Sequence, residues 1–353
     1  MREKLKNYLI DLINIPSVTG KEKEIADYVE KFLKRFFYKK NIIRYSNSLI
    51  AYDSIDQDRR TIAFVGHLDT VPGENSYTGK VIENRLYGLG ASDMKGGLAV
   101  MMGLIDYFSN RKKRFNCVYV FYEKEEGPYN ENGLEPLLKN FNIIQKADLA
   151  LVLEPTNNII QAGCLGTMHA SIIFKGKRAH SARPWQGENA IHKSADFLKR
   201  LSDIKWKEYS FNGLKFIEVI NATMVDFSGG RNIIPDRFVI NVNYRFAPGK
   251  SIEEAKKDIL KLVNGEAEVK FTDICPSGKV SLDNPVLKEL IKRYDMKVEA
   301  KQAWTDVARL SLYGIDAVNF GPGDPAQAHQ KDEFIQLQNL YINFDILKDF
   351  LEA

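Results

Sequence analysis

The chain has 353 residues, with 50 basic and 46 acidic side chains and a formal net charge of +4. This length exceeds the roughly 250–300 residues at which single hydrophobic cores stop growing, so we expect two domains. The small charge excess argues against a nucleic-acid-binding protein, and we interpret the basic clusters at 31–40 and 111–114 as solvated faces. No run approaches the ~18 apolar residues of a membrane span.

The N-terminal segment and the cysteines indicate the compartment. Charged residues interrupt the first apolar positions, which predicts an amphipathic helix and not a secretion signal. Cys117, Cys164 and Cys275 form an odd set without short paired spacing. We therefore expect reduced thiols in a cytoplasmic protein that has neither nucleic-acid nor membrane partners.

The first half of the chain predicts alternating helices and strands. A helix is expected at 2–13, and Thr19 with Glu22 suggests a capping box for a second helix that ends near residue 36. Strands are expected at 42–53 and 61–66, and a Gly-rich segment at 88–97 leads into a helix that ends near residue 108. This order predicts an α/β fold with a mixed, mainly parallel sheet flanked by helices.

The pattern changes after residue 163. Strands at 167–175, 215–226, 237–246 and 267–272 alternate with helices at 189–201 and 251–262 in the order β-α-β-β-α-β. That order is typical of a ferredoxin-like α+β unit. We therefore expect a catalytic domain formed by 1–164 and 276–353, with 165–275 inserted as a lid or dimerisation domain.

Several strand-like segments end in histidine or acidic residues. They are His67 with Asp69 after 61–66, Glu125 with Glu126 after 115–122, Glu154 after 149–153, and His329 after 316–320. In an open α/β sheet, ligands bind beyond the carboxyl ends of the strands. Adjacent carboxylates repel each other, so a cation is expected between them, and the pattern predicts a metal-dependent hydrolase.

Each candidate residue taken alone, including Asp93 and His180 from other segments, has a simpler explanation. His67 could be a histidine satisfied at a strand end, Asp93 a helix cap, Glu154 a solvated loop acid, and His180 part of a surface turn. The Gly88-Leu-Gly90 motif does not indicate a phosphate loop, because no Lys-Ser/Thr follows and Gly-x-Gly-x-x-Gly is incomplete.

Several motifs in order distinguish between these explanations. The chain resembles the metallopeptidase family that includes aminoacylase, acetylornithine deacetylase, glutamate-releasing carboxypeptidase and succinyl-diaminopimelate desuccinylase. The motifs that carry this resemblance are Gly66-His-Leu-Asp-Thr-Val-Pro72, Gly90-Ala-Ser-Asp-Met-Lys-Gly-Gly97, Glu125-Glu-Gly127, Leu153-Glu-Pro-Thr156, Arg178-Ala-His-Ser-Ala-Arg-Pro184, Arg231-Asn-Ile-Ile-Pro-Asp236 and His329. The segments 304–309 and 319–329 look most like the actinobacterial-type desuccinylases.

The resemblance implies a two-zinc centre, with cobalt or manganese as alternative ions. Asp93 would bridge the ions, His67 and Glu154 would complete one site, and Glu126 and His329 the other. Imidazole nitrogen and carboxylate oxygen are ligands that zinc accepts. Glu125 would be the general base, and Asp69 would orient His67.

The resemblance also implies a homodimer that acts on a small N-acyl amino acid. His180, with Asn232, would reach the active site of the partner subunit and stabilise the oxyanion, and the remaining candidates for substrate binding are Arg183, Arg231, Arg245 and Thr305. The expected reaction is removal of succinate from N-succinyl-LL-2,6-diaminopimelate. Deacetylation of N-acetylornithine, aminoacylase or dipeptidase activity on the same scaffold is the first alternative, and a non-catalytic binding protein is a remote one.

Overall fold

The computed structural model describes residues 1–73 and 78–352. Its backbone contacts divide the chain into two compact units. Unit 1 comprises residues 1–163, 281–299 and 309–353, and unit 2 comprises residues 164–280 and 300–308. In these described ranges, no helix has both the length and the apolar character needed to cross a membrane.

Unit 1 contains an eight-stranded mixed sheet in the order β1-β2-β6-β3-β7-β17-β8-β16. The four strands β6, β3, β7 and β17 run parallel to one another, and antiparallel strands flank them. This is the predicted fold class. The strands are β1 (Ile42–Tyr45), β2 (Ser48–Tyr52), β3 (Thr61–His67), β6 (Asn116–Tyr122), β7 (Leu149–Val152), β8 (Ile160–Ala162), β16 (Val298–Ala300) and β17 (Ala317–Asn319).

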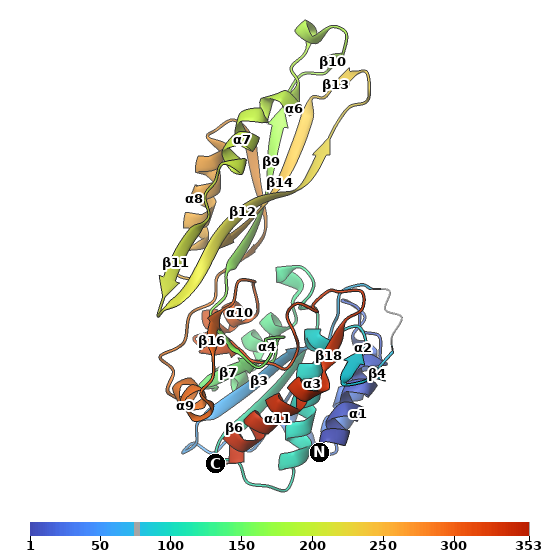
Figure 1. Ribbon diagram of the computed structural model, residues 1–353, viewed down its shortest axis with the longest axis vertical. Helices are drawn as coiled ribbons and strands as arrows, with labels where there is room; N and C mark the ends of the chain where they lie inside the picture. The colour runs from blue at the N-terminus through green and yellow to red at the C-terminus, as the bar shows by residue number, and fades with distance from the viewer. Residues whose placement is uncertain (74–77, 353) are drawn as a thin grey trace. The chain divides into compact units, whose positions relative to one another are not determined.

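The parallel strands form the core of unit 1. Every residue of β3, β6, β7 and β17 is buried, as expected for parallel strands covered on both faces. Helices α1, α3 and α11 pack side by side, and α3 contacts β3 (Figure 1). Gly103 allows this packing, because a Cβ there would lie 2.3 Å from Leu5 Cδ2.

The other elements of unit 1 are shorter. A small sheet has the order β18-β5-β4 and consists of β4 (Lys80–Ile82), β5 (Arg85–Tyr87) and β18 (Phe334–Gln336). The α-helices are α1 (Arg2–Ile13), α2 (Lys23–Leu33), α3 (Gly96–Phe108), α4 (Leu134–Asn140), α5 (Asn142–Gln145), α9 (Pro285–Tyr294), α10 (Val307–Leu312, which begins in unit 2) and α11 (Leu337–Glu352). A short irregular turn, η2 (Ala91–Lys95), precedes α3, and Asp93 and Met94 within it have non-helical backbone angles.

Unit 2 is an antiparallel sheet in the order β11-β12-β14-β9-β15. Without β11 this is the ferredoxin-like order, so the predicted topology is present with one added edge strand. The elements are β9 (Gly166–Lys175), β10 (Ala179–His180), α6 (Ala190–Lys193), α7 (Ala195–Ser202), β11 (Lys207–Phe211), β12 (Leu214–Phe227), β13 (Ile233–Ile234), β14 (Arg237–Phe246), α8 (Ile252–Val263) and β15 (Glu268–Cys275).

A partly buried polar cluster joins β12, β14 and α8 within unit 2. Lys250 Nζ donates to Glu218 Oε2 at 2.9 Å and to Asp258 Oδ2 at 2.7 Å. Tyr244 is 2% exposed, and its hydroxyl lies 3.0 Å from Glu218 Oε2 and 2.9 Å from Asp258 Oδ2, either of which can accept its one proton. Every member of this cluster has a hydrogen-bond or ion-pair partner within it, so we interpret the cluster as structural.

Two local expectations were wrong. Thr19 does not cap a helix: α2 begins at Lys23, Glu22 occupies its N-cap without a side-chain cap bond, and the Thr19 hydroxyl points elsewhere. The 42–53 stretch is a hairpin of β1 and β2 that turns at Ser46, which has a φ of +55°. All three cysteines are buried and free.

Candidate metal centre and active site

The candidate site lies at the carboxyl ends of the four parallel strands of unit 1. His67 is the last residue of β3, Glu125 and Glu126 follow β6, Glu154 follows β7, and His329 comes in the loop after β17. These strands are neighbours in the order β6-β3-β7-β17. The sheet therefore directs residues from positions 67 to 329 to one edge.

Asp93 lies between the two histidines. His67 Nε2 is 3.2 Å from Asp93 Oδ1, and His329 Nε2 is 3.8 Å from Asp93 Oδ2. Glu154 Oε1 lies 3.8 Å from His67 Nε2, and Glu126 Oε1 lies 2.9 Å from His329 Nε2. One carboxylate thus presents an oxygen to each of two histidine–glutamate pairs.

The donor atoms lie close enough to share a metal ion. One ligand atom from each of His67, Asp93 and Glu126 lies within 4.8 Å of the others. The set contains imidazole nitrogen and carboxylate oxygen, which suits zinc. The residues therefore fit a metal centre, and Asp93 offers one carboxylate oxygen towards each histidine.

Asp69 contacts both His67 and the backbone of the glutamate pair. Its main-chain oxygen lies 2.9 Å from His67 Nδ1, closer than its carboxylate Oδ1 at 3.6 Å. The carboxylate instead accepts the backbone N–H of Glu125 at 2.9 Å and that of Glu126 at 3.0 Å. Asp69 therefore fixes the imidazole through its backbone and the glutamate pair through its side chain.

Thr19 is a further contributor to this arrangement. Its hydroxyl donates to Asp69 Oδ2 at 2.9 Å. Its backbone N–H donates to Thr70 O at 3.1 Å, so the loop before α2 lies alongside the segment that follows β3. The sequence held no signal for this role, because Thr19 also had the spacing of a helix cap.

The electrostatics of the site favour positive charge. Burial opposes protonation of His67, but its contacts with Asp69 and Asp93 outweigh burial and hold the pKa of His67 well above its ordinary value. The hydrogen bond with Glu126 raises the pKa of His329 to about 9. The carboxylates thus create a negative potential in which a divalent cation is also stabilised.

Close backbone approach makes the site compact. A Cβ at Gly97 would lie 2.4 Å from the carbonyl oxygen of Leu153, and one at Gly321 would lie 2.3 Å from the same atom. Glycine at these two positions lets α3 and the chain after β17 approach the segment that carries Glu154. A side chain at either position would push the ligand-bearing segments apart.

The predicted substrate residues lie in unit 2, where four of them lie on or next to the two short paired strands β10 and β13, called here the β10–β13 pair. His180 in β10 pairs with Ile233 in β13, and Ser181 N donates to Asn232 O at 3.0 Å. Arg183 N donates to His180 O at 2.8 Å, and Arg231 precedes Asn232. All four are exposed. Ala182 N donates to His180 Nδ1 at 3.1 Å, which leaves Nε2 as the ring's N–H donor in the neutral form.

Arg245 and Thr305 form a separate group in unit 2. Arg245 lies near the end of β14, and its Nε donates to Asn243 Oδ1 at 3.1 Å. Burial lowers its pKa from the usual arginine value. Thr305 is buried, and its carbonyl accepts the Cys164 thiol at 3.6 Å.

The two groups are too far apart to hold one small substrate. The β10–β13 pair lies next to the Arg237 end of β14, eight positions from Arg245. A strand rises about 3.3 Å per residue, so these ends are roughly 26 Å apart. Within one unit 2, a single small molecule cannot contact both groups.

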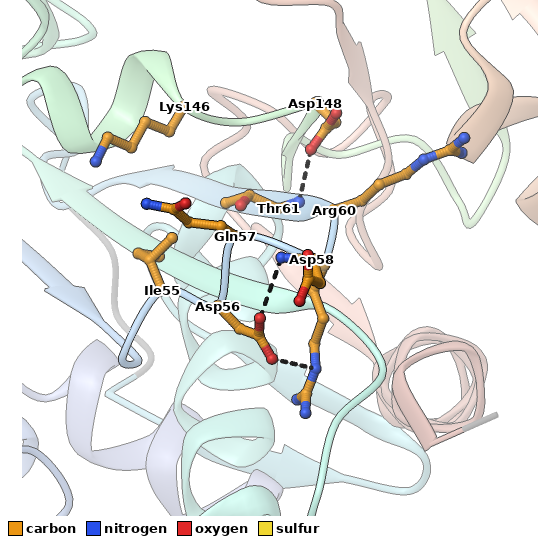
Figure 2. A pocket seen from close by; sticks show the side chains of 9 residues that line it. Ile55, Asp56, Gln57, Asp58, Arg60, Thr61, Lys146 and Asp148 are labelled. Atoms are coloured by element: carbon orange, nitrogen blue, oxygen red, sulfur yellow. Dashed lines mark hydrogen bonds and ion pairs between the residues drawn. The ribbon is translucent and has the colours of Figure 1, made fainter.

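A pocket of unit 1 lies at the opposite, amino-terminal ends of β3 and β7. Figure 2 shows this pocket of about 500 Å³ beside Thr61, the first residue of β3, and Asp148, which precedes β7. Asp148 accepts the Thr61 N–H at 2.7 Å, and Asp56 pairs with Arg59 at 3.1 Å. These contacts stabilise the loop, and the pocket lies away from the strand ends that carry the candidate ligands.

Comparisons with known proteins find matches that cover most of the chain. Residues 63–353 match the model of peptidase family M20/M25/M40. A Mycobacterium tuberculosis protein provisionally named succinyl-diaminopimelate desuccinylase is 36% identical over 341 residues, which cover 96% of each chain. The Corynebacterium glutamicum succinyl-diaminopimelate desuccinylase is 33% identical over 347 residues, which cover 96% of this chain and 94% of the relative.

Solved structures share the fold. A tripeptidase of Staphylococcus aureus has a TM-score of 0.84 at 18% identity and covers 100% of this chain and 98% of its own. A dinuclear metal-binding peptidase of Bacillus subtilis has a TM-score of 0.74 at 15% identity, with 99% and 97% covered. At these identities the likeness establishes the architecture.

Proposed function

The chain belongs to peptidase family M20/M25/M40, and from that premise we propose that it is a cytoplasmic metal-dependent amidohydrolase that releases succinate from N-succinyl-LL-2,6-diaminopimelate. Relatives that carry the desuccinylase name match nearly the whole chain. The observation that carries the proposal is the position of Asp93 between His67 and His329, with a glutamate beside each imidazole.

We assign two divalent ions to this centre, with zinc as the proposed metal and cobalt or manganese as ions that the same donors accept. His67 and Glu154 would hold one ion, Glu126 and His329 the other, and Asp93 both. When bound, such ions supply Lewis acidity and lower the pKa of water towards ~7. Three ligand carboxylates leave the pair of ions with excess positive charge, which suits an electron-rich transition state.

Glu125 is the proposed general base. Asp69 accepts the backbone N–H groups of Glu125 and Glu126 through its two oxygens, so the adjacent carboxylates start from fixed positions. Glu126 contacts His329, which leaves the proton-transfer role to Glu125. Glu125 would take the proton of the attacking water and pass it to the nitrogen of the leaving amine.

The β10–β13 pair of unit 2 is proposed to act in a homodimer. His180 Nε2–H would donate to the oxyanion, because Nδ1 is occupied by the Ala182 N–H. Asn232 lies beside it on the paired strand. The roughly 26 Å between the β10–β13 pair and Arg245 supports the proposal that the β10–β13 pair acts at the active site of a second copy of the chain.

Arginines are proposed to distinguish succinyl from acetyl substrates. A succinyl group carries one more carboxylate than acetyl, and burial of that charge without a partner is costly. Arg183, Arg231 and Arg245 supply guanidinium groups that suit carboxylates, and Thr305 supplies a hydroxyl.

A substrate panel tests this proposal. The purified, metal-loaded protein is assayed with N-succinyl-LL-2,6-diaminopimelate, N-acetylornithine, an N-acetylated neutral amino acid and a dipeptide. The desuccinylase assignment requires the highest kcat/KM on the succinyl substrate. Equal or better rates on N-acetylornithine would overturn the assignment of substrate and leave the hydrolase class standing.

A further inference from the structure

One buried carboxylate gathers three backbone N–H groups of the loop that carries Asp93. Glu333 is 1% exposed. Its Oε2 accepts the N–H of Gly90 at 2.7 Å, and its Oε1 accepts those of Ser92 at 2.7 Å and Asp93 at 2.9 Å. The two oxygens of one carboxyl group thus accept all three N–H groups. The loop at 90–93 is therefore folded around a single side chain.

The strand that follows Glu333 holds this carboxylate in position. In β18, Phe334 pairs with Tyr87 of β5, and Gly88 N donates to Glu333 O at 3.0 Å. The Ser92 hydroxyl donates to Phe334 O at 2.8 Å. These contacts join the loop to β18 through the protein's own backbone and do not involve a ligand.

The same short segment also delivers a proposed metal ligand. His329 lies four residues before Glu333, and its Nε2 is 2.9 Å from Glu126 Oε1 and 3.8 Å from Asp93 Oδ2. Residues 329–333 thus place one ligand directly and hold the loop of another. A shift of this segment would move both sides of the Asp93 carboxylate.

We propose that Glu333 is a positioning residue that fixes Asp93 between His67 and His329, so that affinity for both metal ions depends on a carboxylate that supplies no ligand atom. This inference rests on the proposed two-metal centre. Partners of this kind typically change metal affinity or activity by 10–100-fold when they are replaced.

Glutamine at position 333 provides an isosteric test. The three N–H groups use both carboxylate oxygens, whereas an amide offers one oxygen and one N–H₂ group. In Glu333→Gln, the amide nitrogen must face either Gly90 N–H or the pair from Ser92 and Asp93. Asp332→Asn is the matched control, because Asp332 is the exposed neighbouring carboxylate and loses the same charge.

The experiment titrates metal-free wild type, Glu333→Gln and Asp332→Asn with Co²⁺, followed by calorimetry and by the visible absorption of the bound ion. Glu333→Gln should bind Co²⁺ about 10–100-fold more weakly with an altered spectrum. Excess metal should restore much of its activity, and Asp332→Asn should match wild type. Wild-type affinity and spectrum in Glu333→Gln would overturn the inference. Failure of wild type to bind Co²⁺ would instead overturn the metal centre, and this inference with it.

Hydrogen exchange keeps the inference testable if Glu333→Gln does not fold. In metal-free wild type, the amides of Gly90, Ser92 and Asp93 should exchange slowly, because each is bound by Glu333 before metal arrives. Exchange of these amides at the rate of an exposed loop would overturn the inference.

Discussion

Unit 1 and unit 2 distribute their polar residues in opposite ways. In unit 1, residues separated by more than two hundred positions meet within 4 Å, because neighbouring parallel strands end at one edge. In unit 2, the proposed substrate residues lie at opposite ends of β14. Unit 1 thus brings the candidate metal ligands together, whereas unit 2 separates the candidate substrate residues into two groups. Under the proposed function, unit 1 performs the chemistry and unit 2 serves more than one active site.

The largest expected effect separates base from ligand within unit 1. Glu125→Ala should lower kcat by about 10²–10⁴-fold, because a general base is lost, while metal content stays at the wild-type level. Glu126→Ala should lose metal as well as activity. Atomic emission on both dialysed variants measures the difference, and loss of metal from Glu125→Ala alone would reverse the two assignments.

The next test asks whether His180 of the β10–β13 pair acts at the active site of a partner subunit. His180→Ala should lose about 10²–10³-fold in kcat, the usual loss for an oxyanion donor. Mixed with Glu125→Ala and allowed to exchange subunits, it should recover up to about a quarter of wild-type activity, because about half the dimers are mixed and each has one intact site. No recovery after verified exchange would assign His180 to its own chain or to no catalytic role.

A smaller effect on metal affinity is expected from Thr19, which contacts Asp69 next to the proposed metal ligands of unit 1. Thr19→Val removes the hydroxyl that donates to Asp69 Oδ2 at 2.9 Å while it conserves the shape of the side chain. We expect about tenfold weaker metal binding, measured by calorimetry on the metal-free protein. Thr223→Val, an exposed threonine of β12, is the matched control. Equal affinity in both variants would remove Thr19 from the site.

The smallest effect on turnover is expected from the polar cluster of unit 2. Lys250→Met leaves Glu218 and Asp258 without their cation, and we expect a loss of about 1–3 kcal/mol in the free energy of unfolding with little change in kcat. Thermal unfolding and steady-state rates measure the two quantities. A large fall in kcat at unchanged stability would give this cluster a functional role.

The same variant has a defined pH dependence. Burial opposes ionisation of Asp258, but its hydrogen bonds from Lys250 and Tyr244 lower its pKa. This contribution is present above the unfolded pKa of about 3.9 and is lost as pH falls through the folded value. Ion pairs likewise outweigh burial and raise the pKa of Lys250, so its contribution is lost only in strong alkali. The stability gap between wild type and Lys250→Met should therefore narrow below about pH 4.

The strand ends of unit 1 were predictable because their residues follow apolar runs. His67, Glu126 and Glu154 each lie at or just after a strand, and the parallel sheet brings such positions together. Asp93 was harder to assign, since its spacing before two glycines equally suits a helix cap. In the structure it has φ −121° and ψ 93° and faces His67, so its role came from the resemblance and the geometry.

Other features had no local signal. Glu333 acts on residues about 240 positions earlier, and no periodic pattern links the two segments. The edge strand β11, Lys-Glu-Tyr-Ser-Phe, is mostly exposed, and its two alternating aromatic residues, Tyr209 and Phe211, form too short a pattern to predict a strand. Pairwise contacts between distant segments therefore limit prediction more than the character of each segment does.

The order of the central sheet has a consequence for synthesis of the chain. β17 lies between β7 and β8, which precede it by about 150 residues, and all of the compact insert from 164 to 280 is made in the interval. Because β8 pairs with β17 and β16, which are both made later, the sheet of a polypeptide emerging from the ribosome ends at β7 while a second domain is completed. His329 and Glu333 follow β17, so the newborn chain cannot bring all of the candidate ligands together until these residues emerge.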